Sequence, residues 1–357
     1  MTNKKAFIVA EAGVNHNGSI SKAMDLIDVA AYSGADAVKF QTFKAENFVT
    51  KRADMAKYQK KNTQKKESQF QMLKNLELNY KDYFKIKKRC KQKKIKFLST
   101  AFDQESLNFL VKKLKLDELK IPSGEITNGP YLLSHAKLKK KMIVSTGMSN
   151  MNEIETSLGV IAFGLLKKKW PSLSNFRAAY RSAEGKRVLY KYVTLLHCTS
   201  NYPADLDEIN LNAMIEMKKK FKLPVGYSDH SKGVLVSIAA CAMGATYIEK
   251  HFTLDKKLSG PDHLASLEPD ELKLMIDTIR NIEIVKGKNI KQPQKSEIMN
   301  QKIARRSIVA LRKIKKGEVF NEKNIGIKRP ATGKNPMEYW NLIGKFSKKY
   351  YDMDDNI

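Results

Sequence analysis

The sequence predicts an α/β fold in which a (β/α)8 barrel is followed by a small β-rich domain. First, eight short apolar runs typical of strands alternate with segments of helical periodicity. This alternation indicates a parallel sheet, and eight units in about 250 residues favour a closed barrel over an open doubly wound sheet. Second, the pattern changes near residue 301, where short apolar runs are separated by turn residues.

The eight predicted strands all lie within the first 249 residues. They cover 7–10, 37–40, 96–98, 119–121, 142–144, 193–196, 224–227 and 247–249. After the first strand, Met24, Ile27 and Ala30 recur at helical spacing, and Gly34 marks the end of that helix. A dinucleotide-binding fold would place GxGxxG after the first strand, and residues 11–18 read EAGVNHNG instead.

The remaining elements define the domain boundaries. A final amphipathic helix is predicted within 261–284, and the polar segment 286–300 is predicted to be a linker. We therefore expect a barrel domain over 1–285 and a β-rich domain over 301–357, which is near the lower size limit for independent folding. The basic segment 170–190 extends the connection before the sixth strand and is interpreted as an insertion on the outside or the bottom of the barrel.

The net charge is the unusual feature of the composition. Sixty-six Lys and Arg against 37 Asp and Glu give +29, a balance that raises nucleic acid as a partner. The lysines occur in scattered twos and threes within amphipathic segments, so we expect most of them on solvated helix faces and no nucleic-acid site. Attraction of a small anionic substrate and RNA binding stay open as alternatives.

The cysteines and the hydropathy pattern further limit the class of protein to which this chain can belong. The three cysteines, Cys90, Cys198 and Cys241, include no CxxC pair, which argues against a disulfide framework and a thiolate zinc site. No run of about 18 apolar residues occurs, and the N-terminal segment shows no leader pattern. We expect no membrane association and a cytoplasmic location.

Polar residues follow all eight predicted strands, at the end where parallel barrels build active sites. A single Ser or Thr there can be a helix N-cap, but the full set describes one pocket rim. Because a buried unpaired lysine is costly, Lys39 and Lys120 predict an anionic ligand, with a Schiff-base lysine as the alternative.

His230 and His251 follow consecutive strands and should lie side by side at the rim. With Glu249 and Asp262 nearby, they predict a site for a divalent ion of the Mn, Mg and Zn group, or a hydrogen-bonded histidine pair. Strand alternation points Glu249 and His251 toward the barrel mouth, which makes Glu249 a candidate for proton transfer.

A series of motifs along the chain resembles the sialic acid synthases, that is, N-acetylneuraminate synthase and its legionaminate and pseudaminate relatives. The motifs include AEAGVNHNGS (10–19), AVKFQTF (37–43), KIPSGEITN (120–128), VGYSDHS (225–231), IEKHFTLD (248–255), GPDHLASLEP (260–269) and KRPATG (328–333). The resemblance implies a TIM barrel followed by an antifreeze-like (SAF) domain. It also implies condensation of phosphoenolpyruvate with an open-chain N-acetylated mannosamine-type sugar, which yields a nine-carbon 2-keto acid and phosphate.

The resemblance further implies roles for individual residues. Phosphoenolpyruvate would be held by Lys39, Lys120, Ser123, Ser145, Ser200 and Ser228, and Mn or Mg by His230 and His251. The acidic active-site positions are Glu11, Glu125 and Glu249, and the sugar contacts are Gln41, Tyr202, Asp262 and Arg329. Arg329 would reach the neighbouring subunit's site, which implies a domain-swapped homodimer.

Three functions follow from these residues and motifs, in order of preference. The first is N-acetylneuraminate synthesis from N-acetylmannosamine, with Glu11 or Glu249 as the base that activates water. The second is N,N'-diacetyllegionaminate or pseudaminate synthesis from a 2,4-diacetamido-2,4,6-trideoxyhexose. The third is a basic nucleic-acid-binding protein that keeps an inactive barrel.

Overall fold

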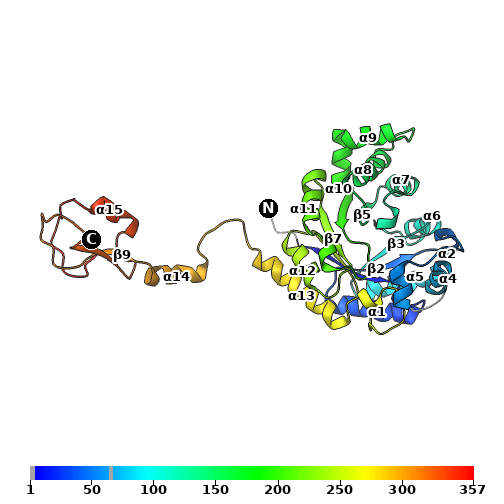
Figure 1. Ribbon diagram of the computed structural model, residues 1–357, viewed down its shortest axis with the longest axis horizontal. Coiled ribbons are helices and arrows are strands. Elements are labelled where there is room, and N and C mark those ends of the chain that lie inside the picture. The colour runs from blue at the N-terminus through cyan, green and yellow to red at the C-terminus, as the bar shows by residue number, and fades with distance from the viewer. Residues whose placement is uncertain (1–4, 64–66) are drawn as a thin grey trace. The chain divides into compact units, whose positions relative to one another are not determined.

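A computed structural model describes residues 5–63 and 67–357, and its main unit is a closed barrel of eight parallel strands (Figure 1). The strands follow one another around the barrel in chain order, and β1 pairs with β8 to close it. They are β1 (Phe7–Gly13), β2 (Ala37–Thr42), β3 (Lys96–Ala101), β4 (Glu118–Ile121), β5 (Lys141–Ser145), β6 (Val193–His197), β7 (Val225–Asp229) and β8 (Tyr247–His251). The predicted (β/α)8 barrel is confirmed.

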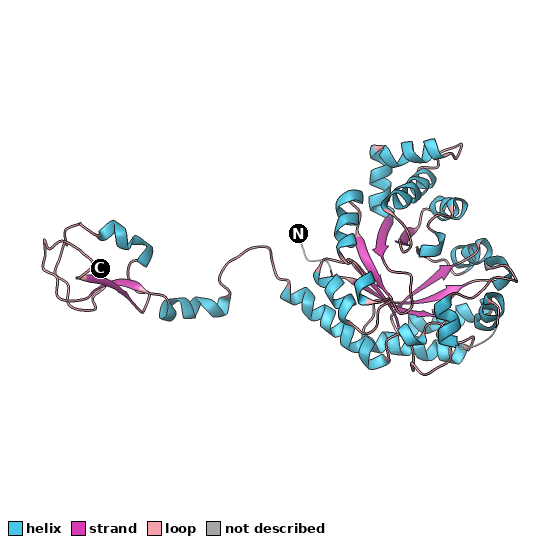
Figure 2. Ribbon diagram, viewed as in Figure 1, coloured by secondary structure: helices cyan, strands magenta, loops and turns pink. Residues whose placement is uncertain are grey.

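Helices form the layer outside the strands (Figure 2). They are α1 (Ile20–Ser33), α2 (Ala45–Phe48), α3 (Lys57–Thr63), α4 (Gln69–Leu76), α5 (Tyr80–Gln92), α6 (Gln104–Asn108), α7 (Gly129–Lys137), α8 (Met151–Leu165), α9 (Leu173–Arg181), α10 (Ala183–Tyr192), α11 (Asn212–Phe221), α12 (Leu235–Ala242) and α13 (Pro269–Val285). Gly34 ends α1 as predicted, because its φ of +86° is a conformation that glycine adopts without strain.

The final barrel helix, α13, forms in the predicted segment. It starts at Pro269, because Glu268 and Glu271 form a reciprocal capping box at its N-terminus. The segment before it instead forms a short turn at His263–Ala265 and a bridge between Phe252 and Leu267. This loop carries Asp262 to the barrel mouth.

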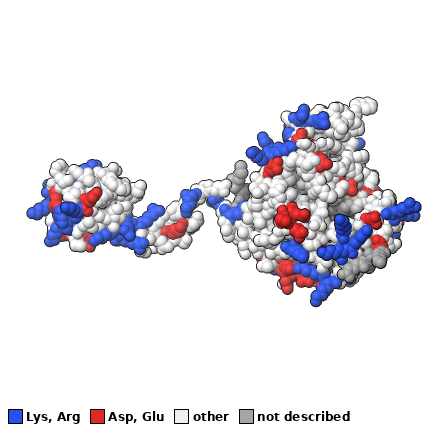
Figure 3. Space-filling view, in the orientation of Figure 1, with Lys and Arg blue, Asp and Glu red and all other residues white. Residues whose placement is uncertain are grey.

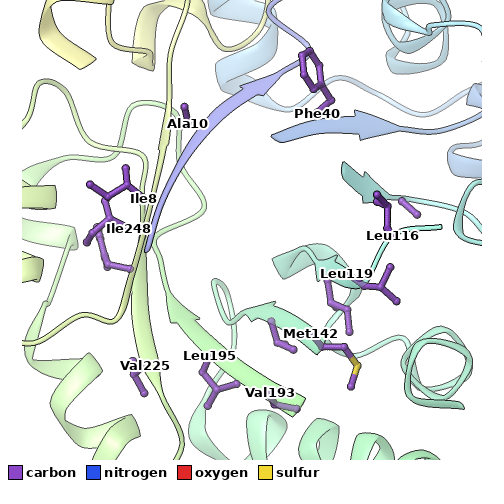
Figure 4. Packing of buried hydrophobic residues seen from close by; sticks show 14 of the residues in the cluster. Ile8, Ala10, Phe40, Leu116, Leu119, Met142, Val193, Leu195, Val225 and Ile248 are labelled. Atoms are coloured by element: carbon purple, nitrogen blue, oxygen red, sulfur yellow. The ribbon is translucent and has the colours of Figure 1, made fainter. Parts of the chain in front are cut away.

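Strand alternation divides the barrel residues into two layers. Outward-facing residues such as Ile8, Met142 and Ile248 pack under the helices in the main core (Figure 4). Inward-facing Val9 and Ile143 belong to a separate small cluster in the barrel interior. The next inward positions toward the carboxyl ends are polar, so the apolar cluster lies at the bottom and the polar residues lie at the mouth.

The predicted insertion 170–190 is helical. It contains α9 and most of α10, and both pack against α8 on the outside of the barrel. The contact with α9 is close, since a Cβ at Gly159 of α8 would lie 2.8 Å from the carbonyl oxygen of Phe176. The insertion therefore takes no part in the barrel mouth.

The C-terminal part is a separate unit, because the chain divides into Met1–Gly287 and Lys288–Ile357. It contains α14 (Lys295–Ala304), the antiparallel strands β9 (Ser307–Ala310) and β10 (Ile325–Lys328), and α15 (Tyr339–Leu342), around a small apolar core. The predicted linker 286–300 overlaps α14, whose start is fixed by a capping box between Gln294 and Glu297. Val319 and Phe320, one of the short apolar runs of this part of the sequence, do not form a strand, since Val319 makes a single bridge, to Phe346.

Surface charge and cysteine state agree with the expectations from composition. On the face of the barrel shown in Figure 3, Lys and Arg are interspersed with Asp and Glu. All three cysteines are buried and free. None of the helices formed by residues 5–63 and 67–357 is long and apolar enough to cross a membrane, and the cytoplasmic location stays a prediction.

Candidate active site

A cavity of about 430 Å³ opens at the mouth of the barrel. It lies at the carboxyl ends of the strands, where the sequence placed a pocket rim. The structure brings all but two of the predicted site residues together around it, namely Glu11, Lys39, Gln41, Lys120, Ser123, Ser145, Ser200, Tyr202, Ser228, His230, Glu249, His251 and Asp262.

Two lysines and two carboxylates form a buried network at the base of this cavity. Lys39 Nζ lies 2.7 Å from Glu11 Oε2 and 3.6 Å from Glu249 Oε2. Lys120 Nζ lies 3.2 Å from Glu249 Oε1, so Glu249 lies between both ammonium groups. All four side chains are buried, and their charges therefore interact much more strongly than exposed charges would.

Hydroxyl groups from neighbouring strands complete the network. Lys39 Nζ donates to Thr100 Oγ1 at 3.1 Å, and Lys120 Nζ donates to Ser145 Oγ at 2.5 Å. Ser228 Oγ donates to Glu249 Oε1 at 2.7 Å. Each ammonium group is thus aimed into the cavity by partners on an adjacent strand.

The two carboxylates differ in their protonation. Burial alone would raise the pKa of Glu249, but Lys120 and Lys39 hold it well below its ordinary value, so Glu249 is ionised. Burial raises the pKa of Glu11 to about 7, because only Lys39 pairs with it closely. Burial would lower the pKa of Lys39, yet Glu11 and Glu249 raise it, and Lys39 is charged.

A glycine allows Ser123 and Ser200 to approach each other at a second polar part of the cavity wall, which we call the serine corner. The backbone N–H of Gly147 donates to Ser123 Oγ at 3.1 Å. A Cβ at Gly147 would lie 2.3 Å from Ser200 Oγ and 2.9 Å from Ser123 Oγ, closer than atoms can approach. This position in the loop after the fifth strand must therefore be glycine for Ser123 and Ser200 to meet there.

The two histidines lie at adjacent strand ends with their ring centroids 5.7 Å apart. His230 Nδ1 donates to the Thr199 carbonyl oxygen at 2.6 Å, which leaves Nε2 unprotonated, and Nε2 lies 3.3 Å from Ser228 Oγ. His251 Nδ1 is buried without a hydrogen-bond partner and lies 4.0 Å from Asp262 Oδ2. Burial lowers the pKa of His230 to about 4, so its ring is neutral.

These donors fit a divalent cation. Such ions prefer nitrogen and oxygen ligands of this kind: a neutral imidazole with an unpartnered buried nitrogen, a second imidazole with an unprotonated Nε2, and a nearby carboxylate. Within the part of the chain that the structure describes, no three His, Cys, Asp or Glu side chains converge into a preformed metal site. A cation held here would keep open positions for water or substrate.

Two predicted residues do not line the cavity. Glu125 follows the fourth strand, but its carboxylate accepts a hydrogen bond from Asn128 Nδ2 at 2.7 Å. Arg329 is exposed at the end of β10 in the unit Lys288–Ile357.

Several lining residues were not predicted. Tyr58, Gln59 and Gln69 reach the cavity from α3 and α4, in the long connection between β2 and α5. The same connection adds an apolar wall that contains Phe48, Met72, Leu73 and Leu76. The sequence feature that could have predicted these residues is the length of this connection, since loops at the carboxyl ends of barrel strands build active sites.

A closed parallel barrel with two buried lysines, an ionised carboxylate and neutral imidazoles at its mouth has the architecture of an enzyme active site, and the buried lysines are suited to a small anionic ligand. Comparison with known proteins gives the family: residues 26–291 match the NeuB family and residues 305–350 match the SAF domain. The chain belongs to the NeuB family. It is a synthase, and the enzymes of this family condense phosphoenolpyruvate with an acetylated amino sugar.

Individual relatives cover almost the whole chain. It is 49% identical to an N,N'-diacetyllegionaminic acid synthase of Campylobacter jejuni over 99% of both chains. It is 44% identical to one of Legionella pneumophila, over 95% of this chain and 89% of that protein. The crystal structure of a sialic acid synthetase from Leptospira borgpetersenii is similar with a TM-score of 0.67 and 32% identity, covering 84% of this chain and 90% of that one.

Proposed function

We propose that this enzyme is an N,N'-diacetyllegionaminic acid synthase, which joins phosphoenolpyruvate to a 2,4-diacetamido-2,4,6-trideoxyhexose and releases phosphate. The supporting observation is the high identity to two such synthases, 49% and 44%, against 32% to the sialic acid synthetase. We therefore prefer the 2,4-diacetamido-2,4,6-trideoxyhexose to N-acetylmannosamine, which was the first choice from the sequence.

The apolar wall of the cavity supports this choice of sugar. Met72 and Leu73 of α4 and Phe48 of α2 line the same cavity as the two lysines. A 6-deoxy sugar with a second acetamido group presents methyl groups to such a wall, whereas N-acetylmannosamine presents two hydroxyls. Buried hydroxyls without partners are disfavoured, so the wall favours the deoxy sugar.

Phosphoenolpyruvate is the anion that the buried cations are suited to hold. We assign its phosphate and carboxylate to Lys39 and Lys120, with hydroxyls of Ser123, Ser145, Ser200 and Ser228 around them. Both ammonium groups are already oriented by Thr100 and Ser145 before substrate arrives. This preorganisation lowers the cost of placing C3 of phosphoenolpyruvate against the aldehyde carbon of the sugar.

His230, His251 and Asp262 are the residues that would hold a divalent metal, Mn or Mg. Such an ion, when bound, supplies Lewis acidity for negative charge on the aldehyde oxygen. The hydrogen bond from His230 Nδ1 to Thr199 fixes its ring orientation. Tyr202, whose ring lies 4.1 Å from that of His230, limits the space beside it.

The two carboxylates divide the rest of the chemistry. As C3 of phosphoenolpyruvate bonds to the aldehyde carbon, the π electrons of the aldehyde move to its oxygen, which becomes an alkoxide, and positive charge develops at C2. Glu249, which accepts hydrogen bonds from Lys120 and Ser228, stays ionised close to that charge. Glu11, which pairs with Lys39 Nζ at 2.7 Å and whose pKa burial raises to about 7, takes one proton of the water that adds to C2, and this proton then neutralises the alkoxide of the former aldehyde. Cleavage of the C2–O bond then releases phosphate, which takes the remaining proton of the added water, and C2 becomes the carbonyl carbon of the 2-keto acid.

Two measurements test the proposal. Phosphate release from phosphoenolpyruvate is compared with 2,4-diacetamido-2,4,6-trideoxymannose and with N-acetylmannosamine, and we expect kcat/KM to favour the former roughly 10- to 100-fold. Chelation should abolish turnover and Mn²⁺ should restore it. Equal or better turnover of N-acetylmannosamine would assign the enzyme to sialic acid synthesis, and no turnover of either sugar would refute the synthase assignment for both.

We also propose that Arg329 acts in the site of a second copy of the chain, in a homodimer. Support comes from the separate unit that carries it and from the exposed segment 284–300 before β9. An Arg329→Ala chain mixed with a His251→Ala chain should recover activity in heterodimers, because one site then receives both wild-type residues. Absence of recovery in mixed dimers, or a monomer by light scattering, contradicts the exchange.

A further inference from the structure

A second buried ion pair lies behind the active site and has no part in the chemistry proposed above. Lys250 of β8 and Asp229 of β7 both have 0% exposed side chains, and Lys250 Nζ lies 3.1 Å from Asp229 Oδ2. Neither residue lines the cavity. Alternation along β8 directs Lys250 outward, toward the helix layer that Ile248 also faces (Figure 4).

The pair binds every polar group of one residue, Ser231. Asp229 Oδ1 accepts from the Ser231 backbone N–H at 2.9 Å and from Ser231 Oγ at 2.7 Å. Lys250 Nζ donates to the Ser231 carbonyl oxygen at 2.5 Å. The other oxygen of Asp229 accepts from Ser237 Oγ of α12 at 2.7 Å, which connects the pair to the outer helix.

Ser231 directly follows His230, so these contacts fix the peptide that carries the His230 ring. The carbonyl of His230 itself accepts from the backbone N–H of Ala204 at 2.9 Å. On the other strand, Lys250 lies between Glu249 and His251, and Asp229 is its partner in the register of β7 and β8. A single ion pair therefore holds the two strand ends from which His230 and His251 enter the cavity.

We propose that Lys250 and Asp229 are positioning residues that hold His230 and His251 in the geometry for binding the divalent cation. The assignment of that cation rests on the proposed function. A fully buried ion pair is not required for stability, because apolar residues of similar volume pack a core equally well. Apolar residues would not orient the Ser231 peptide, whereas this pair satisfies both its N–H and its carbonyl group. Outer groups of this kind typically orient metal-binding histidines.

The test uses the full chain with both charges removed together, Asp229→Asn with Lys250→Met, since a single change would leave a buried unpaired charge. We expect Mn²⁺ affinity, measured by electron paramagnetic resonance, to fall about 10- to 100-fold while the circular dichroism spectrum is retained. Selective ¹⁵N labelling of histidine should show His230 as the Nδ1–H form in the unaltered chain and as a mixture of tautomers in the double variant. Unchanged Mn²⁺ affinity and an unchanged His230 tautomer would overturn the proposal.

Matched serine variants decide the matter if the double variant does not fold. Ser231→Ala removes one contact on the side of His230, and Ser237→Ala removes one contact on the side of the helix. We expect about a tenfold loss of Mn²⁺ affinity for the first and less than about twofold for the second, and equal effects would refute the positioning role. If the unaltered chain binds no Mn²⁺, the metal assignment fails, and the His230 tautomer still tests the positioning role.

Discussion

Lys39 and Glu11 form an ion pair inside the barrel, with Nζ 2.7 Å from Oε2 and side chains only 3% and 2% exposed. The pair joins β1 to β2, whose register places these two residues opposite each other. Glu249 Oε1 accepts hydrogen bonds from Ser228 and Lys120, and Glu249 Oε2 lies 3.6 Å from Lys39, whereas Glu11 pairs closely with Lys39 alone. Burial accordingly raises the pKa of Glu11 to about 7, whereas the two lysines hold the pKa of Glu249 well below its ordinary value, so Glu11 is the carboxylate that can accept and release a proton near neutral pH.

Replacing Glu11 with Gln should lower kcat by about 10²- to 10⁴-fold, the usual contribution of a general base. Glutamine keeps the side-chain volume, and Lys39 retains Glu249 as a partner at 3.6 Å, so the fold should persist. The rate of phosphate release at saturating substrates measures the effect. Glu125→Gln, the same change outside the cavity lining, is the control and should leave kcat within about twofold. Full activity in the Glu11 variant would transfer the base role to Glu249.

The fold was predictable because hydropathy and strand spacing are local properties. The predicted strands at 7–10 and 37–40 continue to Gly13 and Thr42 in the structure. The apolar pattern ends early there because the last inward residues, Glu11 and Gln41, are polar yet lie in the barrel mouth. The polar residues at the strand ends thus indicated the site. They are also the reason that the predicted strands end too early.

Side-chain pairing was not predictable, because it depends on tertiary geometry. Glu125 shares a motif with Ser123, but its carboxylate turns to Asn128 rather than to the cavity. From the sequence alone, a lysine such as Lys250 would be expected at the surface, but its side chain is completely buried against Asp229. Tyr58 lies in a segment without a strand-end signal and reaches the site through the fold of the β2–α5 connection.

Gly147→Ala should raise KM for phosphoenolpyruvate. The added Cβ would lie 2.3 Å from Ser200 Oγ, so Ser200 or the loop must move away from the serine corner, which receives the anion. We expect an increase of roughly 10- to 100-fold in KM with a smaller change in kcat, because the catalytic carboxylates are on other strands. Gly129→Ala is the matched control, since a Cβ there meets no atom within 4 Å. Equal KM values in the two variants would contradict the role of the serine corner.

A buried histidine away from the site should make stability fall in acid. His135 of α7 is 0% exposed, and burial lowers its pKa from the ordinary value of 6.5 to about 4. The unfolded chain therefore binds a proton that the folded chain does not, and stability is lost as the pH falls from 6.5 toward 4. The loss from this residue at about pH 5 is about 2 kcal/mol relative to about pH 7.

His135→Phe tests this effect because it keeps a ring against Tyr131, which the His135 ring contacts edge-on at 4.4 Å. It also removes Nε2, a buried nitrogen without a hydrogen-bond partner. Thermal unfolding at about pH 7 and about pH 5 should show a smaller decrease in Tm for the variant than for the unaltered chain. The same decrease in both proteins would show that His135 does not contribute to acid sensitivity.

The net charge of +29 should be detectable as electrostatic steering of one substrate and not of the other. Phosphoenolpyruvate is an anion, and the acetamido sugar is neutral, so the positive field should raise the encounter rate of the former alone. As NaCl rises from about 0.05 to about 0.5 M, the Debye length falls from about 14 to about 4 Å and the field is screened. We expect kcat/KM for phosphoenolpyruvate to fall several-fold while kcat/KM for the sugar stays nearly constant. Parallel decreases for both substrates would indicate a general salt effect on the enzyme, because steering acts only on the charged substrate.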